Sequence, residues 1–373
     1  MRNLQRGWQH LGRVLAIWLV WSLAGVAAET ARKYQPLDWE WKKSEISELK
    51  ELAKKVQTEP DGSLTLETAN WRVRTWHTPL FTAQAGKYME IFSEIFFKAF
   101  VLKGERGFKD FKPELQIHPS RESYLAVGKI PAWTAGVNVA SWTRSGDKVT
   151  PEITLHTYFA YQKGGKNAKE PVFGTKVPLG TIQHEATHCL LQCIFGPMIL
   201  PMWLNEGAAS YYEGWPLRQK ISADGESPKD VEARNKRRSH SPGPRELSAQ
   251  IKQNVGSGIP TLRALTGANT QAEFYCDNGG PRTRLNYNLA ESFIDFLMNS
   301  RNRRPLMLAI LERVRDQRGA AEPPFVTDAE IREYEKDWLQ FLESRWGVKF
   351  PPAQLKERLR VLKEERAEKG GNP

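Results

Sequence analysis

The stretch Thr181-Ile-Gln-His-Glu-Ala-Thr-His-Cys-Leu-Leu191 contains two histidines four residues apart. On a helix, His184 and His188 would lie on one face, about one turn from each other. Glu185 lies between them, where it can reach a water molecule on a metal ion that both imidazoles bind. This is the pattern His-Glu-x-x-His, in which two neutral imidazoles bind Zn²⁺ and the carboxylate acts as general base. The alternative is an ordinary helix with two solvated or core histidines.

The flanking residues predict that this stretch is a buried helix. Pro178 suits a first helical turn, and Gly196-Pro197 is a stop signal. Between them, the apolar positions are Ile182, Leu190, Leu191, Ile194 and Phe195.

A second apolar helix is predicted over residues 201–213, and it carries Glu206. Glu206 follows His188 at a distance that allows one turn and an antiparallel helix. Burial of an unpaired carboxylate is very costly, and a bound metal ion would relieve that cost. We therefore expect His184, His188 and Glu206 to bind one Zn²⁺ per chain.

These two segments together resemble a known group of enzymes. His184-Glu185-x-x-His188, followed by Trp203-Leu-Asn-Glu206-Gly-Ala-Ala-Ser-Tyr-Tyr-Glu213, is similar to the gluzincin metallopeptidases, and most similar to the peptidase-MA-like group with its secreted bacterial members. The resemblance covers residues 66–345, and its specific motifs lie in 181–213. It implies an α+β, zincin-like fold with an N-terminal mixed sheet, a metal helix and a helical C-terminal subdomain. It also implies that Glu206 is the third zinc ligand.

One departure from the group concerns spacing. The segment between His188 and Glu206 is one residue shorter than in the common aminopeptidase pattern, and the loop 196–201 can absorb the difference. The aminopeptidases also carry Gly-x-Met-Glu-Asn on the strand before the zinc helix, and this chain lacks that signature there. The resemblance therefore implies an endopeptidase or a narrowly specific peptidase, with a peptide or protein as substrate.

Residues 1–28 predict a secretory signal peptide. This segment has three arginines and no acidic residue, an apolar run from Val14 to Ala24, and a small-residue cleavage site at Val26-Ala27-Ala28. The alternative is a membrane anchor, but the run is short for a span and no basic flank follows it. We expect export to the periplasm or the extracellular space, with no stable membrane insertion after the signal is removed.

The charge balance does not predict a nucleic-acid partner. The net charge of +11 falls to +8 once the three arginines of the signal are removed, and the remaining charges are dispersed. The most basic stretch, Arg234-Asn-Lys-Arg-Arg238, lies in the loop predicted over 216–260. It is interpreted as a solvated run, with a processing site or an anion contact as alternatives.

The three cysteines, Cys189, Cys193 and Cys276, are an odd number for an exported protein. Cys276 could pair with one of the other two, or all three could be small buried hydrophobic residues. No Cys-x-x-Cys pair is present, so a zinc site made of cysteines is not supported.

The rest of the chain is divided by its hydrophobic periodicity. Residues 29–62 are a leader with a short helix at 44–57. Residues 63–345 are the zincin-like metallopeptidase domain, with the sheet and the zinc helices in 63–213 and a variable loop and helices in 214–345. Residues 346–373 are a charged tail, with a helix at 351–369 to which we assign no function.

Inside this domain, strands are predicted at 63–68, 70–77, 115–118, 137–142 and 152–158, and helices at 83–102, 286–299, 305–318 and 328–345. The strand 152–158, the last before the metal helix, is expected to edge the cleft. An extended substrate could add to it by main-chain hydrogen bonds.

Three protein ligands would leave one position of the zinc for water, which is the catalytic arrangement. Glu185 is the predicted general base. Tyr287 is the first candidate for an oxyanion donor, because it is predicted to open a helix where related enzymes supply a tyrosine or histidine; the alternative is a packed helix-start tyrosine. The weaker candidates for this role are Tyr158, Tyr211 and His240, and the candidates for orienting a ligand are Asn205 and Ser210.

Two other functions compete with peptide hydrolysis. One is a binding or scaffold protein that keeps the fold and the metal without turnover, although all three ligands and the base are present. The other is a metal-dependent amidase that acts on a non-peptide amide, such as a cell-wall component.

Overall fold

The computed structural model describes residues 16–19, 41–100, 111–128, 130, 134–146, 148–159, 172–174, 177–196, 200–213, 243–253, 260–277, 280–298, 303–316 and 325–369. The chain divides into two compact units, Met1–Pro197 and Met198–Pro373. The first unit contains a mixed sheet with helices, and the described part of the second is helical. The expected mixture of helices and one mixed sheet is therefore confirmed. Among the described residues, no helix combines the length and the apolar character needed to cross a membrane.

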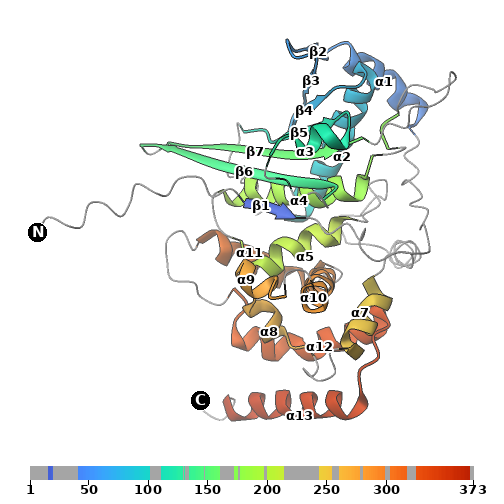
Figure 1. Ribbon diagram of the computed structural model, residues 1–373. Coiled ribbons are helices and arrows are strands. Elements are labelled where there is room, and N and C mark those ends of the chain that lie inside the picture. The colour runs from blue at the N-terminus through green and yellow to red at the C-terminus, as the bar shows by residue number, and fades with distance from the viewer. Residues whose placement is uncertain are drawn as a thin grey trace, which may run out of the picture. The chain divides into compact units, whose positions relative to one another are not determined.

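The first unit is built on one seven-stranded sheet in the order β1-β6-β7-β5-β4-β3-β2 (Figure 1). β5 pairs in parallel with both β4 and β7, and the other neighbours are antiparallel. The strands are β1 (Ala16–Leu19), β2 (Gln57–Thr58), β3 (Leu64–Glu67), β4 (Arg72–Thr75), β5 (Glu114–His118), β6 (Gly136–Ser145) and β7 (Lys148–Tyr158).

Two long helices cover one face of this sheet. α2 packs against β3 and β4, α4 packs against β6 and β7, and α2 and α4 contact each other. Below them, Val73, Leu115 and Leu155 lie in register on β4, β5 and β7 and are fully buried. The helices of this unit are α1 (Lys43–Ala53), α2 (Pro79–Phe100), α3 (Arg121–Leu125) and α4 (Leu179–Phe195).

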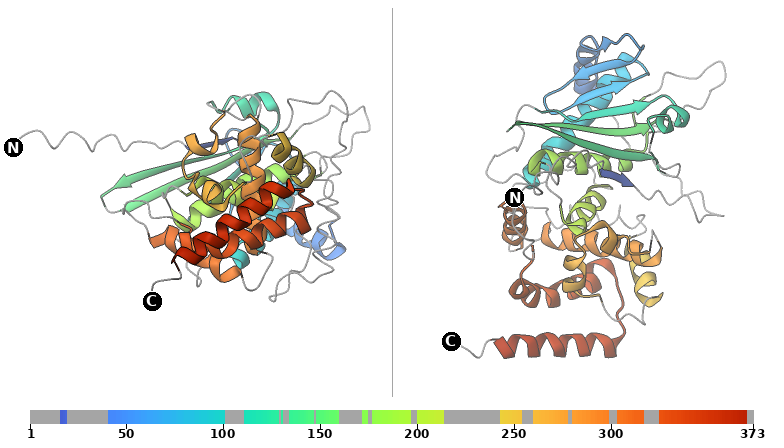
Figure 2. Two further views of the ribbon diagram at one scale, coloured as in Figure 1. Left: turned by 90° about the horizontal axis from the view of Figure 1, so that it is seen from below. Right: turned by 60° about the vertical axis from the view of Figure 1, so that its left-hand side comes forward.

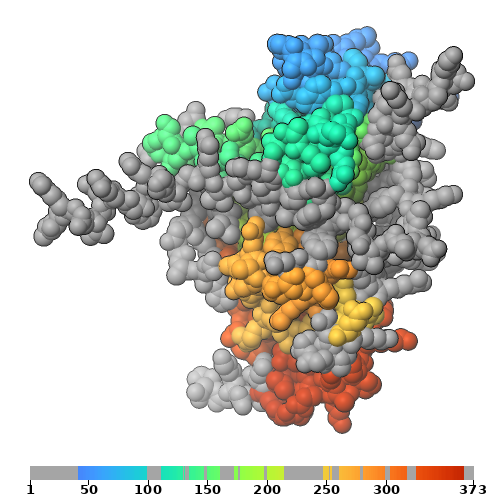
Figure 3. All heavy atoms as spheres, in the orientation of Figure 1, coloured from blue at the N-terminus to red at the C-terminus, as the bar shows by residue number. Residues whose placement is uncertain are grey.

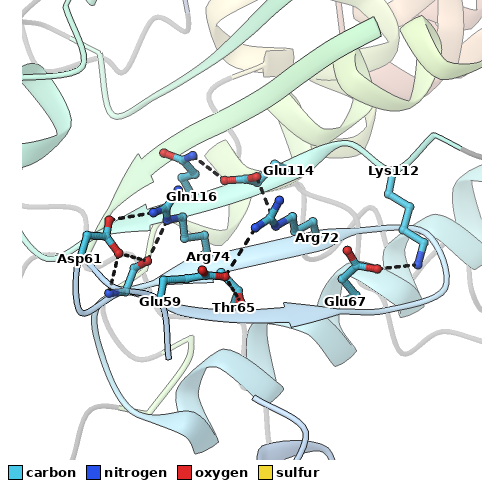
Figure 4. A network of polar contacts seen from close by, with 10 residues as sticks. Glu59, Asp61, Thr65, Glu67, Arg72, Arg74, Lys112, Glu114 and Gln116 are labelled. Carbon is cyan, nitrogen blue, oxygen red and sulfur yellow. Dashed lines mark hydrogen bonds and ion pairs between the residues drawn. The ribbon is translucent and has the colours of Figure 1, made fainter. Parts of the chain in front are cut away.

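The opposite face of the sheet is polar at β4 and β5. The Arg74 guanidinium lies 2.7 Å from an Asp61 carboxylate oxygen, and that of Arg72 lies 3.7 Å from Glu114 and 3.6 Å from Glu59 (Figure 4). Arg72 and Arg74 alternate along β4 with the buried residues of the other face. The strand predicted at 70–77 is therefore present as β4.

The same polar face carries a pair of buried histidines. His118 Nε2 on β5 lies 3.2 Å from His156 Nδ1 on β7, and Trp76 stacks on His118 at 5.3 Å between ring centroids. Burial, with a smaller contribution from Arg74, lowers the pKa of His118 to about 4. Burial, with a smaller contribution from His118, lowers the pKa of His156 to about 3. Both imidazoles are therefore neutral near pH 7.

The expectation that an extended substrate adds to strand 152–158 by main-chain hydrogen bonds is wrong. It is the second half of β7, which lies between β5 and β6 and pairs with both. Because its two edges are already hydrogen-bonded, β7 has no place for a substrate strand. The strand outside it is β6, whose residues Val137–Ala140 pair with β1. β1 lies inside the segment that the sequence assigns to the signal peptide.

The second unit is organised around α10, which packs against α5 (Figures 1 and 2). A Cβ on Gly207 of α5 would lie 2.8 Å from the backbone carbonyl oxygen of Ala290 on α10, so only glycine permits this approach. The helices are α5 (Met202–Glu213), α7 (Gly243–Gln253), α8 (Leu262–Gly267), α9 (Gln271–Phe274), α10 (Pro281–Met298), α11 (Arg304–Asp316), α12 (Asp328–Trp346) and α13 (Pro352–Lys369).

α12 begins with a capping box. Thr327 accepts a hydrogen bond from the Glu330 backbone N–H, and the Glu330 carboxylate accepts one from the backbone N–H of Thr327. Further along α12, the Glu335 carboxylate is fully buried and accepts two hydrogen bonds from Arg358 of α13, at 2.6 and 3.0 Å. This ion pair fixes α13, which lies at the surface of the unit (Figure 3).

Several boundaries differ from those predicted. α10 begins at Pro281, so Tyr287 lies inside the helix and does not open it. α7 lies within the stretch 216–260 that the sequence assigned to a loop. The two units divide between α4 and α5, whereas the sequence placed both helices in one segment, 63–213.

Candidate metal centre

The two histidines lie where the spacing predicts. α4 runs from Leu179 to Phe195, and all of its residues are buried. The rings of His184 and His188 lie one turn apart, with centroids 5.0 Å from each other, and the two residues are 2% and 1% exposed. On the sheet side, Cys189 donates from Sγ to Asn138 Oδ1 of β6 at 3.4 Å. The helix is therefore held against the sheet by polar contacts as well as by apolar packing.

The carboxylate of the site comes from α5. Glu206 is fully buried, and its neighbour Gly207 allows α5 to approach α10 closely. A carboxylate in such surroundings needs a cation or strong hydrogen-bond donors, because desolvation penalises its charge.

One ligand atom from each of His184, His188 and Glu206 lies within 4.8 Å of the other two. Two imidazoles and one carboxylate are a donor set that divalent metal ions accept. All three residues are buried. The group can therefore bind a metal ion, as the sequence predicts.

Glu185 is fully buried on the same helix as the two histidines. It lies close to the start of β6, because a Cβ on Gly136 would be 3.4 Å from Glu185 Cγ and 2.5 Å from Thr181 Cγ2. Gly136 is thus the residue that lets β6 pass this close to α4. Burial raises the pKa of Tyr124, and the nearby Glu185 contributes to that shift.

A residue that the sequence did not single out contacts the carboxylate. Tyr275, directly after α9, donates its hydroxyl hydrogen to Glu206 Oε1 at 2.7 Å. The contact joins positions 69 residues apart in the chain. No motif or spacing indicates it, and only the preceding capping box of Thr270 and Glu273 marks the local turn.

Tyr287 also reaches this group. Its hydroxyl oxygen lies 3.2 Å from that of Tyr275, and Phe274 packs against both rings. Burial raises the pKa of Tyr287 well above its usual range, and Glu206 and Tyr275 add to the shift. The hydroxyl therefore stays protonated and can act as a hydrogen-bond donor.

The other candidates are less directly placed. Asn205 is buried and Ser210 is partly exposed on α5, and Tyr211 packs edge-on against Tyr212 at 5.1 Å. Tyr158, at the end of β7, packs against Tyr124 at 5.2 Å. His240 lies outside the described residues.

The cysteines do not form the disulfide considered from the sequence. All three are among the described residues, and no disulfide joins any of them. Cys189 and Cys193 are buried, whereas Cys276 is exposed. The interpretation of Cys189 and Cys193 as small buried residues agrees with the structure.

A scan against protein-family models finds no match for this chain, and no curated protein matches its sequence.

Proposed function

We propose that this protein is an exported zinc-dependent peptidase with a zincin-like fold. The observation that carries the proposal is the buried group His184, His188 and Glu206, whose ligand atoms lie within 4.8 Å of one another. Two imidazoles and one carboxylate are typical of catalytic zinc sites, which keep a further position for water. The proposal also rests on Glu185, which occupies the second position of His-Glu-x-x-His on the same helix.

Each residue then has a distinct role. His184, His188 and Glu206 would hold Zn²⁺, which when bound lowers the pKa of a water molecule towards ~7 and polarises the scissile carbonyl. Glu185 accepts a proton from the attacking water and delivers it to the leaving amine. Tyr287, protonated in its buried position, is the candidate donor to the oxyanion that develops on the substrate.

The test combines metal analysis with hydrolysis of a peptide library by the zinc-loaded mature protein. We expect one zinc per chain in the wild type, with weakened binding in His184→Ala and in Glu206→Gln. Glu185→Gln should keep its zinc and its fold but lose activity by at least 10²–10⁴-fold, the scale of general acid–base catalysis.

Two outcomes would contradict the proposal. A wild-type protein that binds no zinc when zinc is supplied would remove the metal centre. Full hydrolysis by Glu185→Gln would remove the mechanism and favour the scaffold alternative.

A further inference from the structure

Tyr275 makes a direct hydrogen bond to a predicted metal ligand, and no motif in the sequence indicates this contact. Its hydroxyl donates to Glu206 Oε1 at 2.7 Å, a distance typical of a strong O–H···O bond to a carboxylate. Glu206 is fully buried, so water does not compete for this oxygen as it would at the surface.

The single hydrogen of the Tyr275 hydroxyl limits its role in the neighbouring contact with Tyr287. A tyrosine hydroxyl carries one hydrogen, and that of Tyr275 goes to Glu206. In the 3.2 Å contact between the hydroxyls of Tyr275 and Tyr287, the Tyr275 oxygen can then only accept. Tyr287 is also close enough to Glu206 for a hydrogen bond with its carboxylate to raise the pKa of Tyr287, so both hydroxyls lie beside this carboxylate.

The segment that carries Tyr275 is held on both sides. Before it, the Phe274 carbonyl accepts a hydrogen bond from the Asn286 side chain of α10 at 2.8 Å. After it, the Asp277 carboxylate accepts from the backbone N–H groups of Arg282 and Thr283 at the start of α10. These bonds fix the backbone around Tyr275 without involving its hydroxyl.

We propose that Tyr275 is a positioning residue of the metal centre, which holds one oxygen of Glu206 and leaves the other for the metal ion. The inference rests on the proposed function, because it requires that Glu206 is a metal ligand. A hydrogen bond to one oxygen restricts the rotation of the carboxylate and so holds it in one orientation for a bound ion. Partners of this kind typically contribute 10–100-fold to metal affinity.

The test measures zinc affinity by competition with a chromophoric chelator. Tyr275→Phe keeps the ring that packs on Phe274 and removes only the hydroxyl, and it should bind zinc 10–100-fold more weakly than the wild type. The matched control is Tyr334→Phe on α12, the same chemical change outside the metal centre, and its affinity should equal that of the wild type. In the Co²⁺-substituted protein, the visible absorption bands should shift in Tyr275→Phe only, because they report ligand geometry.

A second measurement separates positioning from a general structural role. The rise in melting temperature on adding zinc should be smaller in Tyr275→Phe than in the wild type and in Tyr334→Phe, because weaker zinc binding stabilises the folded state less. If Tyr275→Phe does not fold, Asn286→Ala takes its place. That variant releases the Phe274 carbonyl, keeps the hydroxyl, and should weaken zinc binding at least threefold.

The failures of the two proposals are distinguishable. If the wild type binds no zinc, the proposed function is wrong and the inference falls with it. If the wild type binds one zinc and Tyr275→Phe binds it within twofold as tightly with unchanged Co²⁺ bands, only the positioning role is wrong. The same holds if a folded Asn286→Ala used in its place keeps wild-type affinity.

Discussion

At the scale of single residues, the two carboxylates of the centre, Glu206 and Glu185, have different surroundings. Glu206 receives a hydrogen bond from Tyr275, which stabilises its ionised form, whereas Glu185 lies against the start of β6 beside Gly136. Tyr287 lies beside both groups, with its hydroxyl oxygen 3.2 Å from that of Tyr275 and with Glu206 raising its pKa. Its hydrogen can therefore turn to a substrate oxygen while the bond from Tyr275 to Glu206 stays in place.

This arrangement predicts the effect of Tyr287→Phe. If Tyr287 donates to the oxyanion, the variant should lower kcat by about 10²–10³-fold, the scale of one lost donor, while KM changes little. Its zinc content should stay at one per chain, because the bond from Tyr275 to Glu206 remains. Steady-state kinetics together with metal analysis checks this, and an unchanged kcat would exclude Tyr287 as the donor.

At the scale of elements, sequence periodicity predicts those helices and strands that depend on neighbouring residues. The helix around His184 and His188, the strand at 70–77 and the helix at 328–345 all follow from neighbouring residues, and all are present. The inner position of β7 and the bond from Tyr275 to Glu206 join distant segments. Strand order and side-chain contacts of that kind leave no periodic trace in a single sequence.

The early start of α10 has a similar explanation. Pro281 suits a first helical turn, and Asp277 caps the exposed N–H groups there, but the polar residues between 281 and 286 carry no apolar period. The prediction therefore began the helix at its first apolar face and placed Tyr287 at the opening.

The attachment of α13 predicts a large difference between two arginines of that helix. Arg358→Met leaves the fully buried Glu335 carboxylate without its ion-pair partner and should destabilise the protein by about 3–5 kcal/mol. Arg360→Met removes only exposed contacts to Glu357 and Glu364 and should have a far smaller effect. Urea denaturation of both variants measures the two values, and equal effects would show that the buried pair does not anchor α13.

At the scale of the whole molecule, the buried histidine pair predicts sensitivity to acid. His118 and His156 have folded-state pKa values lowered to about 4 and about 3. The unfolded chain binds protons at these sites near pH 6.5, whereas the folded protein does not. The contribution of the two neutral histidines to the free energy of unfolding is complete above pH 6.5 and is lost as the pH falls towards 3–4. Between pH 7 and 5, the free energy of unfolding should fall by roughly 1–2 kcal/mol per histidine.

The measurement is the slope of unfolding free energy against pH in metal-free protein. His156→Gln should reduce that slope by up to about one proton between pH 6 and 5, because one titrating group is removed. Arg74 and Tyr124 beside the pair keep their charge states in this range, and His77, whose pKa burial lowers to about 4, is present in both proteins. If His156→Gln has the same slope as the wild type, His156 is not a source of the acid sensitivity.

The processing of the whole chain gives a separate prediction. Export with cleavage after Ala28 should leave Glu29 as the first residue of the exported protein. N-terminal sequencing of secreted material checks this within one or two residues. Full-length protein retained in the membrane would mean that residues 1–28 are an anchor.

The pairing of β1 with β6 gives that cleavage a consequence for how the protein behaves in solution. Removal of residues 1–28 would take β1 with it and leave the backbone N–H and C=O groups of Val137–Ala140 without their strand partner. An uncovered strand edge is a template for another chain, so the mature protein would be more prone to self-association than its precursor. Added charge at this edge should then improve the solubility of the mature form and leave that of the precursor unchanged.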